Sequence, residues 1–109
     1  MKDTEKYLRY IIEYIERLEN ELGGISEAEF LADIDKQDST LRRLEVIGET
    51  VKRLPSSFRE KHPECPWKEI AGMRDVLIHA YFRVDLKLVW IITQKEVPKL
   101  KQDVERILK

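Results

Sequence analysis

The chain has 109 residues, of which 42% are hydrophobic and 38% are charged. This length suits a single domain over residues 1–109, and the composition excludes a disordered chain. The net charge of −1 excludes the strongly basic surface of a non-specific nucleic-acid binder. The charge is uneven, however. Residues 1–41 carry five basic and eleven acidic side chains (−6), whereas residues 42–87 carry ten basic and seven acidic ones (+3), which is compatible with a compact anion-binding cleft.

Several classes of protein and site are excluded by what the sequence lacks. The first ten residues, MKDTEKYLRY, contain no apolar stretch typical of a secretory signal, and the longest apolar run, 88–92, is too short to span a bilayer. A cytoplasmic location without membrane contact is therefore expected. Cys65 is the only cysteine, which excludes an intrachain disulfide and a cysteine-based zinc site. Neither a glycine-rich phosphate loop nor a paired-histidine motif occurs, so no cofactor or metal is expected.

The N-terminal half predicts three helices. Gly23 and Gly24 end the first helix, and Ser26 with Glu29 forms a capping-box pattern that begins a short second one. The third helix is stopped by Pro55. Apolar residues recur at helical spacing in the first and third helices: Leu8, Ile11, Ile12, Ile15, Leu18 and Leu22, then Leu41, Leu44, Ile47, Val51 and Leu54.

The C-terminal half predicts a connector over residues 56–66 with about one helical turn, followed by two further helices. Pro66 suits the first position of the fourth helix, whose apolar residues are Trp67, Ile70, Met73, Leu77 and Ala80. The last helix begins near Asp85 and is expected to kink at Pro98. Its apolar residues are Leu86, Val89, Trp90, Val97, Leu100, Val104 and Ile107. The predicted fold is all-α, an antiparallel bundle of about four long helices and one short helix.

Residues 74–81 contain the side chains best suited to chemistry. The guanidinium of Arg74 offers a planar fork for a phosphate, and the imidazole of His79 transfers protons near neutral pH. The hydroxyl of Tyr81 can donate or accept a hydrogen bond, or can be covalently modified. These groups suit phosphodiester cleavage without a metal, in which an imidazole assists attack by a ribose 2′-hydroxyl and a cation stabilises the transition state.

Helical geometry limits how these side chains could cooperate. At about 100° per residue, Arg74 and Tyr81 share one helix face, whereas His79 lies roughly 140° from Arg74. Either the helix ends near His79, or a second subunit completes the site. Asp75 precedes His79 by four residues and shares its face, so its carboxylate could orient the imidazole.

A purely structural interpretation of the same residues stays open. His79 could be a hydrogen-bonded packing residue, and Arg74 could pair with Glu45 or Glu49 of the third helix. Trp67, Trp90 and Phe82 are expected to be core or interface aromatics. His62 is expected to be a solvated loop residue, and the glutamates of the first helix are expected to form a solvated face. The thiol of Cys65 is expected to be inert.

A wider pattern around these residues resembles a known family. The segments LRRLEVIGETVKRLP, CPWKEIAGMRDVLIHAYFRVDLKLVW and VPKL are similar to the HepT (DUF86) family of the HEPN superfamily. The similarity covers roughly residues 41–100. Its most specific part is the run that joins PW, AGMRD and H-x-Y-F.

This resemblance implies a five-helix HEPN bundle that forms a homodimer, with the two motifs meeting in an interfacial cleft. It implies a metal-independent ribonuclease toxin of a type VII-like toxin–antitoxin pair, acting on RNA and controlled by a minimal nucleotidyltransferase antitoxin. Arg74 would bind the scissile phosphate, and His79 would be the general acid or base. Tyr81 would be the tyrosine that receives AMP, and Asp75 would give polar support.

Two other functions are compatible with the sequence. The chain could be a non-catalytic HEPN module that binds a nucleotide or docks a nucleotidyltransferase, which its near-neutral charge suits. It could also be a purely structural helical dimer. The expected dimer face is the side of the third and fourth helices, because that side carries Gly48, Gly72 and the motif.

Overall fold

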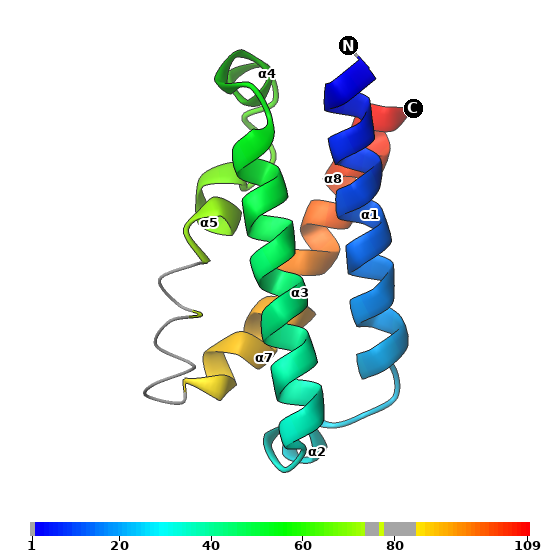
Figure 1. Ribbon diagram of the computed structural model, residues 1–109, viewed down its shortest axis with the longest axis vertical. Helices are drawn as coiled ribbons and strands as arrows, with labels where there is room; N and C mark the ends of the chain where they lie inside the picture. The colour runs from blue at the N-terminus through cyan, green and yellow to red at the C-terminus, as the bar shows by residue number, and fades with distance from the viewer. Residues whose placement is uncertain (1, 74–76, 78–84) are drawn as a thin grey trace.

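The computed structural model describes residues 2–73, 77 and 85–109, and its secondary structure there is helical with no strand. Helix α1 (Lys2–Leu22) and helix α3 (Ile34–Arg53) lie side by side and antiparallel, joined through the short helix α2 (Glu27–Leu31). The C-terminal helix α8 (Glu96–Leu108) returns beside α1, so both chain ends lie at the same end of the bundle (Figure 1). The predicted all-α antiparallel bundle is confirmed.

The predicted signals between α1 and α3 are confirmed. Gly23 donates its backbone N–H to the carbonyl of Glu19 at 2.8 Å, and Gly24 adopts a positive φ of 84°, which favours glycine over residues with a Cβ. Ser26 and Glu29 form the complete capping box that begins α2. In addition to these predicted signals, Asp33 caps α3 by accepting a hydrogen bond from the backbone N–H of Lys36.

The connector has the predicted helical turn, but the fourth predicted helix is interrupted. Helix α4 (Ser56–Lys61) supplies the expected turn of the connector, and helix α5 (Trp67–Ala71) begins directly after Pro66. However, α5 ends after five residues, with Gly72 as its C-cap. The prediction of one uninterrupted helix carrying Trp67 to Ala80 is therefore wrong at Gly72.

The predicted kink in the last helix is confirmed, but it lies three residues before Pro98. Helix α7 (Leu86–Gln94) stops at Lys95, where the chain turns before α8 begins. Pro98 is the third residue of α8 and has no N–H to donate to the carbonyl of Gln94, with which its ring would clash. The proline therefore interrupts the helix one turn earlier than its own position.

The core lies between α1, α3 and the C-terminal helices. It contains most of the predicted apolar residues, among them Leu8, Ile11, Ile15, Leu18, Leu44, Ile47, Val51, Val89, Val97, Leu100 and Val104. Phe30 of α2 is also fully buried. Gln37 of α3 donates from its side-chain amide to the carbonyls of Phe30 and Leu31 at 3.0 and 3.1 Å, which holds α2 against α3.

The sequence predicts that the glutamates of α1 form a solvated face, but two of them form ion pairs with neighbouring helices. Glu21 forms an ion pair with Arg43 of α3 at 3.0 Å and accepts a hydrogen bond from Ser39. Glu19 pairs with Lys101 of α8 at 2.7 Å. These glutamates therefore link α1 to both neighbouring helices. In the part of the chain that the structure describes, no helix is both long and apolar enough to cross a membrane.

Candidate active site

The four predicted site residues, Arg74, Asp75, His79 and Tyr81, lie outside the described residues. The structure does describe what precedes, interrupts and follows them. These parts are α5 with Gly72 and Met73, the single residue Leu77, and Asp85 with α7. Together these parts form the frame around the motif.

The loop that precedes α5 is fixed by a buried tryptophan. Trp67 is buried, and its indole Nε1–H donates to the backbone carbonyl of His62 at 2.9 Å. The ring of Phe58 lies 4.8 Å from that of His62 and 6.1 Å from that of Trp67, measured between centroids. His62 is accordingly half-buried and packed, which corrects its interpretation as a solvated loop residue. Its Nδ1 also lies 3.5 Å from a carboxylate oxygen of Glu64.

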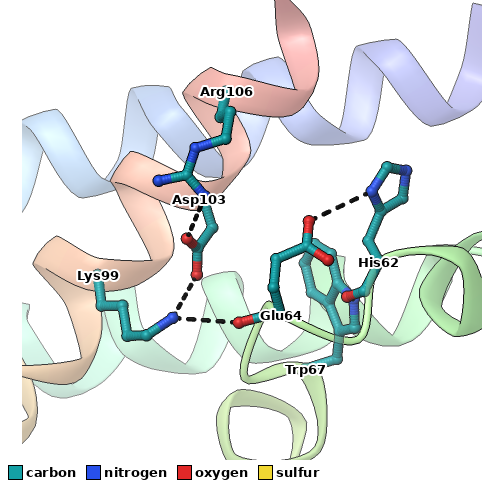
Figure 2. A network of polar contacts seen from close by, with 6 residues as sticks. All are labelled: His62, Glu64, Trp67, Lys99, Asp103 and Arg106. Carbon is teal, nitrogen blue, oxygen red and sulfur yellow. Dashed lines mark hydrogen bonds and ion pairs between the residues drawn. The ribbon is translucent and has the colours of Figure 1, made fainter.

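Lys99 of α8, which pairs with the buried carboxylate of Asp103, also binds this loop (Figure 2). Asp103 is only 4% exposed and accepts hydrogen bonds from Lys99 at 2.7 Å and Arg106 at 3.3 Å. Lys99 donates in addition to the backbone carbonyl of Glu64 at 3.1 Å. The chain leading into α5 is thus tied to the C-terminal helix. The sequence pattern did not indicate this role of Asp103, because its partner loop lies about 40 residues earlier in the chain.

The thiol of Cys65 lies inside this anchored loop. It is buried, and desolvation with the nearby carboxylates of Asp103 and Glu64 raises its pKa from 9.0 to about 12. A protonated, buried thiol is a poor nucleophile. The expectation that Cys65 is chemically inert agrees with this environment.

Helix α5 approaches α3 closely at Gly48. A Cβ on Gly48 would lie 3.2 Å from the backbone carbonyl oxygen of Ile70, tighter than most such contacts. Glycine at position 48 therefore permits the close approach of the two helices. This approach occurs within one chain, so Gly48 no longer supports the choice of this side as the dimer face.

Two described residues on either side of Arg74–Val76 are anchored in the core. Met73 and Leu77 are each 3% exposed. Leu77 also lines a narrow crevice with Ala71 and with Glu45, Gly48 and Glu49 of α3. Glu45 pairs with Arg42 at 3.9 Å and Glu49 with Lys52 at 3.7 Å. Both carboxylates thus lie in the same crevice as Ala71 and Leu77.

Beyond the motif, Asp85 directly precedes α7 and makes no side-chain cap. Trp90 of α7 packs against Phe30, with ring centroids 5.3 Å apart, so both predicted aromatic positions Trp67 and Trp90 are packed against the core. Phe82 lies outside the described residues. Leu88 and Ile91 are exposed on α7. Within the described ranges, no group of three or more potential ligands could hold a metal ion.

Comparison with known proteins gives a match over nearly the whole chain. The model of the family described as "Ribonuclease HepT-like" matches residues 11–107, a range that includes Arg74, Asp75, His79 and Tyr81. No solved structure matches the chain.

Curated relatives agree with this family match. The chain is 47% identical over 108 residues to the "Putative RNase" of Caldanaerobacter subterraneus subsp. tengcongensis, covering 99% of this chain and 96% of the relative. It is 44% identical over 110 residues to the "Probable ribonuclease HepT" of Thermococcus cleftensis, with all of both chains covered. It is also 46% identical over 107 residues to the "Gamma-glutamylcyclotransferase and putative RNase" of Methanocaldococcus jannaschii. There the match covers 98% of this chain but only 48% of the relative.

Proposed function

Because the chain belongs to the family of HepT-like ribonucleases, we propose that it cleaves RNA and that Arg74, His79 and Tyr81 are its working residues. The observation that carries this proposal is the family match over residues 11–107, within which the R-x4-H-x-Y pattern is intact. The frame around the motif supports it. Residues Met73 and Leu77 are anchored in the core, and the preceding loop is tied to α8.

The proposed reaction is an internal transesterification of RNA. The imidazole of His79 removes the proton of a ribose 2′-hydroxyl, and the 2′-oxygen attacks the adjacent phosphorus. The bond from phosphorus to the 5′-oxygen breaks, and this oxygen takes up a proton, which leaves a 2′,3′-cyclic phosphate and a 5′-hydroxyl. Arg74 binds the phosphate and stabilises its growing negative charge, while Asp75 orients the imidazole. No step requires a metal.

The test is cleavage of total cellular RNA in the presence of EDTA by protein produced without any partner. The wild-type chain is expected to cut RNA and leave 2′,3′-cyclic phosphate ends, and His79→Ala is expected not to cut. Cleavage that disappears with EDTA would contradict the metal-free reaction.

We further propose that the chain is the toxin of a type VII-like pair and that a minimal nucleotidyltransferase antitoxin adenylylates Tyr81. An adenylyl group adds bulk and a negative phosphate where an RNA phosphate must bind, so it opposes substrate binding. Co-expression with the cognate nucleotidyltransferase should increase the intact mass by one AMP group, and Tyr81→Phe should abolish the increase. An unchanged wild-type mass would contradict this regulation.

The toxin role has a separate readout in cells. Expression of the wild-type chain without its antitoxin is expected to arrest growth, because cleavage of cellular RNA stops protein synthesis. His79→Ala, expressed to the same level, should relieve the arrest. Equal arrest by both proteins would show that the toxicity does not depend on this chemistry.

One observation favours a second function. The chain has a net charge of −1, and its first 41 residues carry eleven acidic against five basic side chains, which suits a module that binds a protein or nucleotide better than one that coats RNA. In that case the chain would dock the nucleotidyltransferase without cleaving RNA. Absence of cleavage by protein whose intact mass shows no modification would favour this second function.

A further inference from the structure

A surface cavity of about 560 Å³ lies between α4 and α5, immediately before the motif. Arg59, Ser56 and Glu60 of α4 line it, together with Lys68 and Glu69 of α5. Arg59 is half-buried rather than extended into solvent. Its Nε is buried and has no hydrogen-bond partner among the described residues.

The unpaired donor of Arg59 makes this arginine the candidate in the cavity for binding an anion. A buried donor left without an acceptor costs about 1–3 kcal/mol, so such groups usually meet a partner in the working state of a protein. Several arginines of the described chain have carboxylate partners, such as Arg9 with Glu5, Arg17 with Glu13 and Arg43 with Glu21. Arg53 has none in the described ranges either, but it is exposed to solvent, whereas Arg59 is half-buried. No ion pair of Arg59 is found in the described ranges. Its planar fork, the ammonium of Lys68 and the hydroxyl of Ser56 match the oxygens of a phosphodiester.

The cavity lies close to the proposed scissile site along the chain. Ala71 is part of the cavity wall, and three residues later comes Arg74. Three residues span at most about 11 Å between Cα atoms. A strand whose phosphate is bound by Arg74 would therefore reach the cavity within a few nucleotides.

We propose that Arg59, Lys68 and Ser56 form a phosphate subsite that binds the RNA strand beside the scissile phosphate. This inference rests on the proposed ribonuclease function and names where the substrate extends. The anchored loop serves this subsite as well as the motif, because residues 62–66 connect α4 to α5 and are held by Trp67 and Lys99.

The two carboxylates in the cavity reduce its attraction for anions at long range. Glu60 and Glu69 balance the charges of Arg59 and Lys68, so the cavity attracts anions weakly at long range. Binding must then depend on short hydrogen bonds to a strand already held at Arg74. Such a subsite extends recognition of the substrate without adding non-specific affinity, in keeping with the net charge of −1.

The test measures binding of a fluorescent single-stranded oligoribonucleotide to the full chain carrying His79→Ala, so that the strand stays intact. Adding Arg59→Gln is expected to weaken binding about tenfold, the loss of one charge-assisted hydrogen-bonding group. It should also flatten the dependence of log affinity on log salt by roughly 0.7, as for one lost phosphate contact. Glu69→Gln should tighten binding, because it removes a repulsive charge.

Two further variants separate a binding role from a structural one. Arg9→Gln removes an exposed arginine of α1, the helix that lies across α3 from α5 in Figure 1. It is expected to leave the RNA affinity and its salt dependence unchanged. Arg59→Lys keeps the charge but loses the fork, so its affinity should lie between those of wild type and Arg59→Gln. If Arg59→Gln unfolds, Arg59→Lys and Glu69→Gln still decide the question.

The outcomes distinguish this subsite from the proposed function. Cleavage by the wild-type chain with unchanged RNA affinity in the Arg59 and Glu69 variants would overturn the subsite alone. Binding that depends on Arg59 without any cleavage would support the subsite and overturn the ribonuclease proposal. Neither cleavage nor binding would overturn both. A change from dimer to monomer on Arg59→Gln, with equal RNA affinity per subunit, would assign the cavity to a protein interface instead.

Discussion

Asp103 is a buried carboxylate that pairs with Lys99 and Arg106 of its own helix. Through Lys99, which also donates to the carbonyl of Glu64, it is connected to the loop before α5. Asp103→Asn keeps the shape but removes the charge and sets an amide donor against the donors of Lys99 or Arg106. We expect a loss of about 1–3 kcal/mol in the free energy of unfolding, measured by urea denaturation. Asp38→Asn, an exposed position of α3, should change it by less than about 0.5 kcal/mol. Equal effects of the two substitutions would contradict the structural role of Asp103.

Cys65 offers a second test at a single residue. Because its pKa is raised from 9.0 to about 12, the folded state holds the protonated thiol and the unfolded state ionises first. The stability gained from this difference is complete below pH 9.0 and is lost as the pH rises towards about 12. The native protein at pH 8 should therefore react slowly with a disulfide reagent, and protein unfolded in urea should react quickly. Fast stoichiometric labelling of the native protein would show that the thiol is accessible and ionised.

The contact between α3 and α5 depends on the absence of a side chain at Gly48. Gly48→Val would place a Cβ 3.2 Å from the carbonyl oxygen of Ile70 and further methyl groups beyond it. We expect destabilisation by about 1–3 kcal/mol and reduced RNA cleavage, because α5 leads directly into the motif. Urea denaturation and the cleavage rate measure the two effects.

Glu49→Val is the matched control for this contact, since it introduces the same side chain at the adjacent, exposed position of α3. It should lower stability much less than Gly48→Val. Similar losses in both variants would mean that the β-branched residue, and not the contact with α5, is responsible.

At the scale of the helices, the sequence predicted the elements whose signals are local. The capping box of Ser26, the glycine end of α1 and the apolar stripes of α1 and α3 depend on residues within a few positions, and all are confirmed. The interruption at Gly72 was missed, because the apolar spacing continues through it. The break at Lys95 was displaced from Pro98, because a proline acts on the carbonyl four residues earlier.

The surroundings of the site were less predictable than the helices. Its polar contacts join residues from different elements: the ion pair of Glu21 with Arg43, and the hydrogen bonds from Lys99 to Glu64 and from Trp67 to His62. No sequence periodicity indicates such pairs, because they form only once the bundle has folded. The motif residues Arg74, His79 and Tyr81 stay predictions, supported by the family match over residues 11–107.

For the whole molecule, the family resemblance leads us to expect a homodimer. A second subunit would complete each site if residues 74–81 formed one straight helix, on which Arg74 and His79 would be roughly 140° apart. Mixing Arg74→Ala with His79→Ala subunits should then restore activity. With random exchange, half of the dimers are mixed and each has one complete site, giving about a quarter of the wild-type rate. An inactive mixture, with subunit exchange verified by mass, would place both residues of a site in one subunit.

The central claim is that this chain is a ribonuclease in which His79 transfers the proton. The most direct measurement is kcat/KM on one defined oligoribonucleotide, with EDTA present, for wild type, His79→Ala and His62→Ala. These are the two histidines of the chain, and His62 packs against Phe58 in the loop before α5. We predict a loss of about 10²- to 10⁴-fold for His79→Ala and only a few-fold loss for folded His62→Ala. Equal rates for wild type and His79→Ala would contradict the claim.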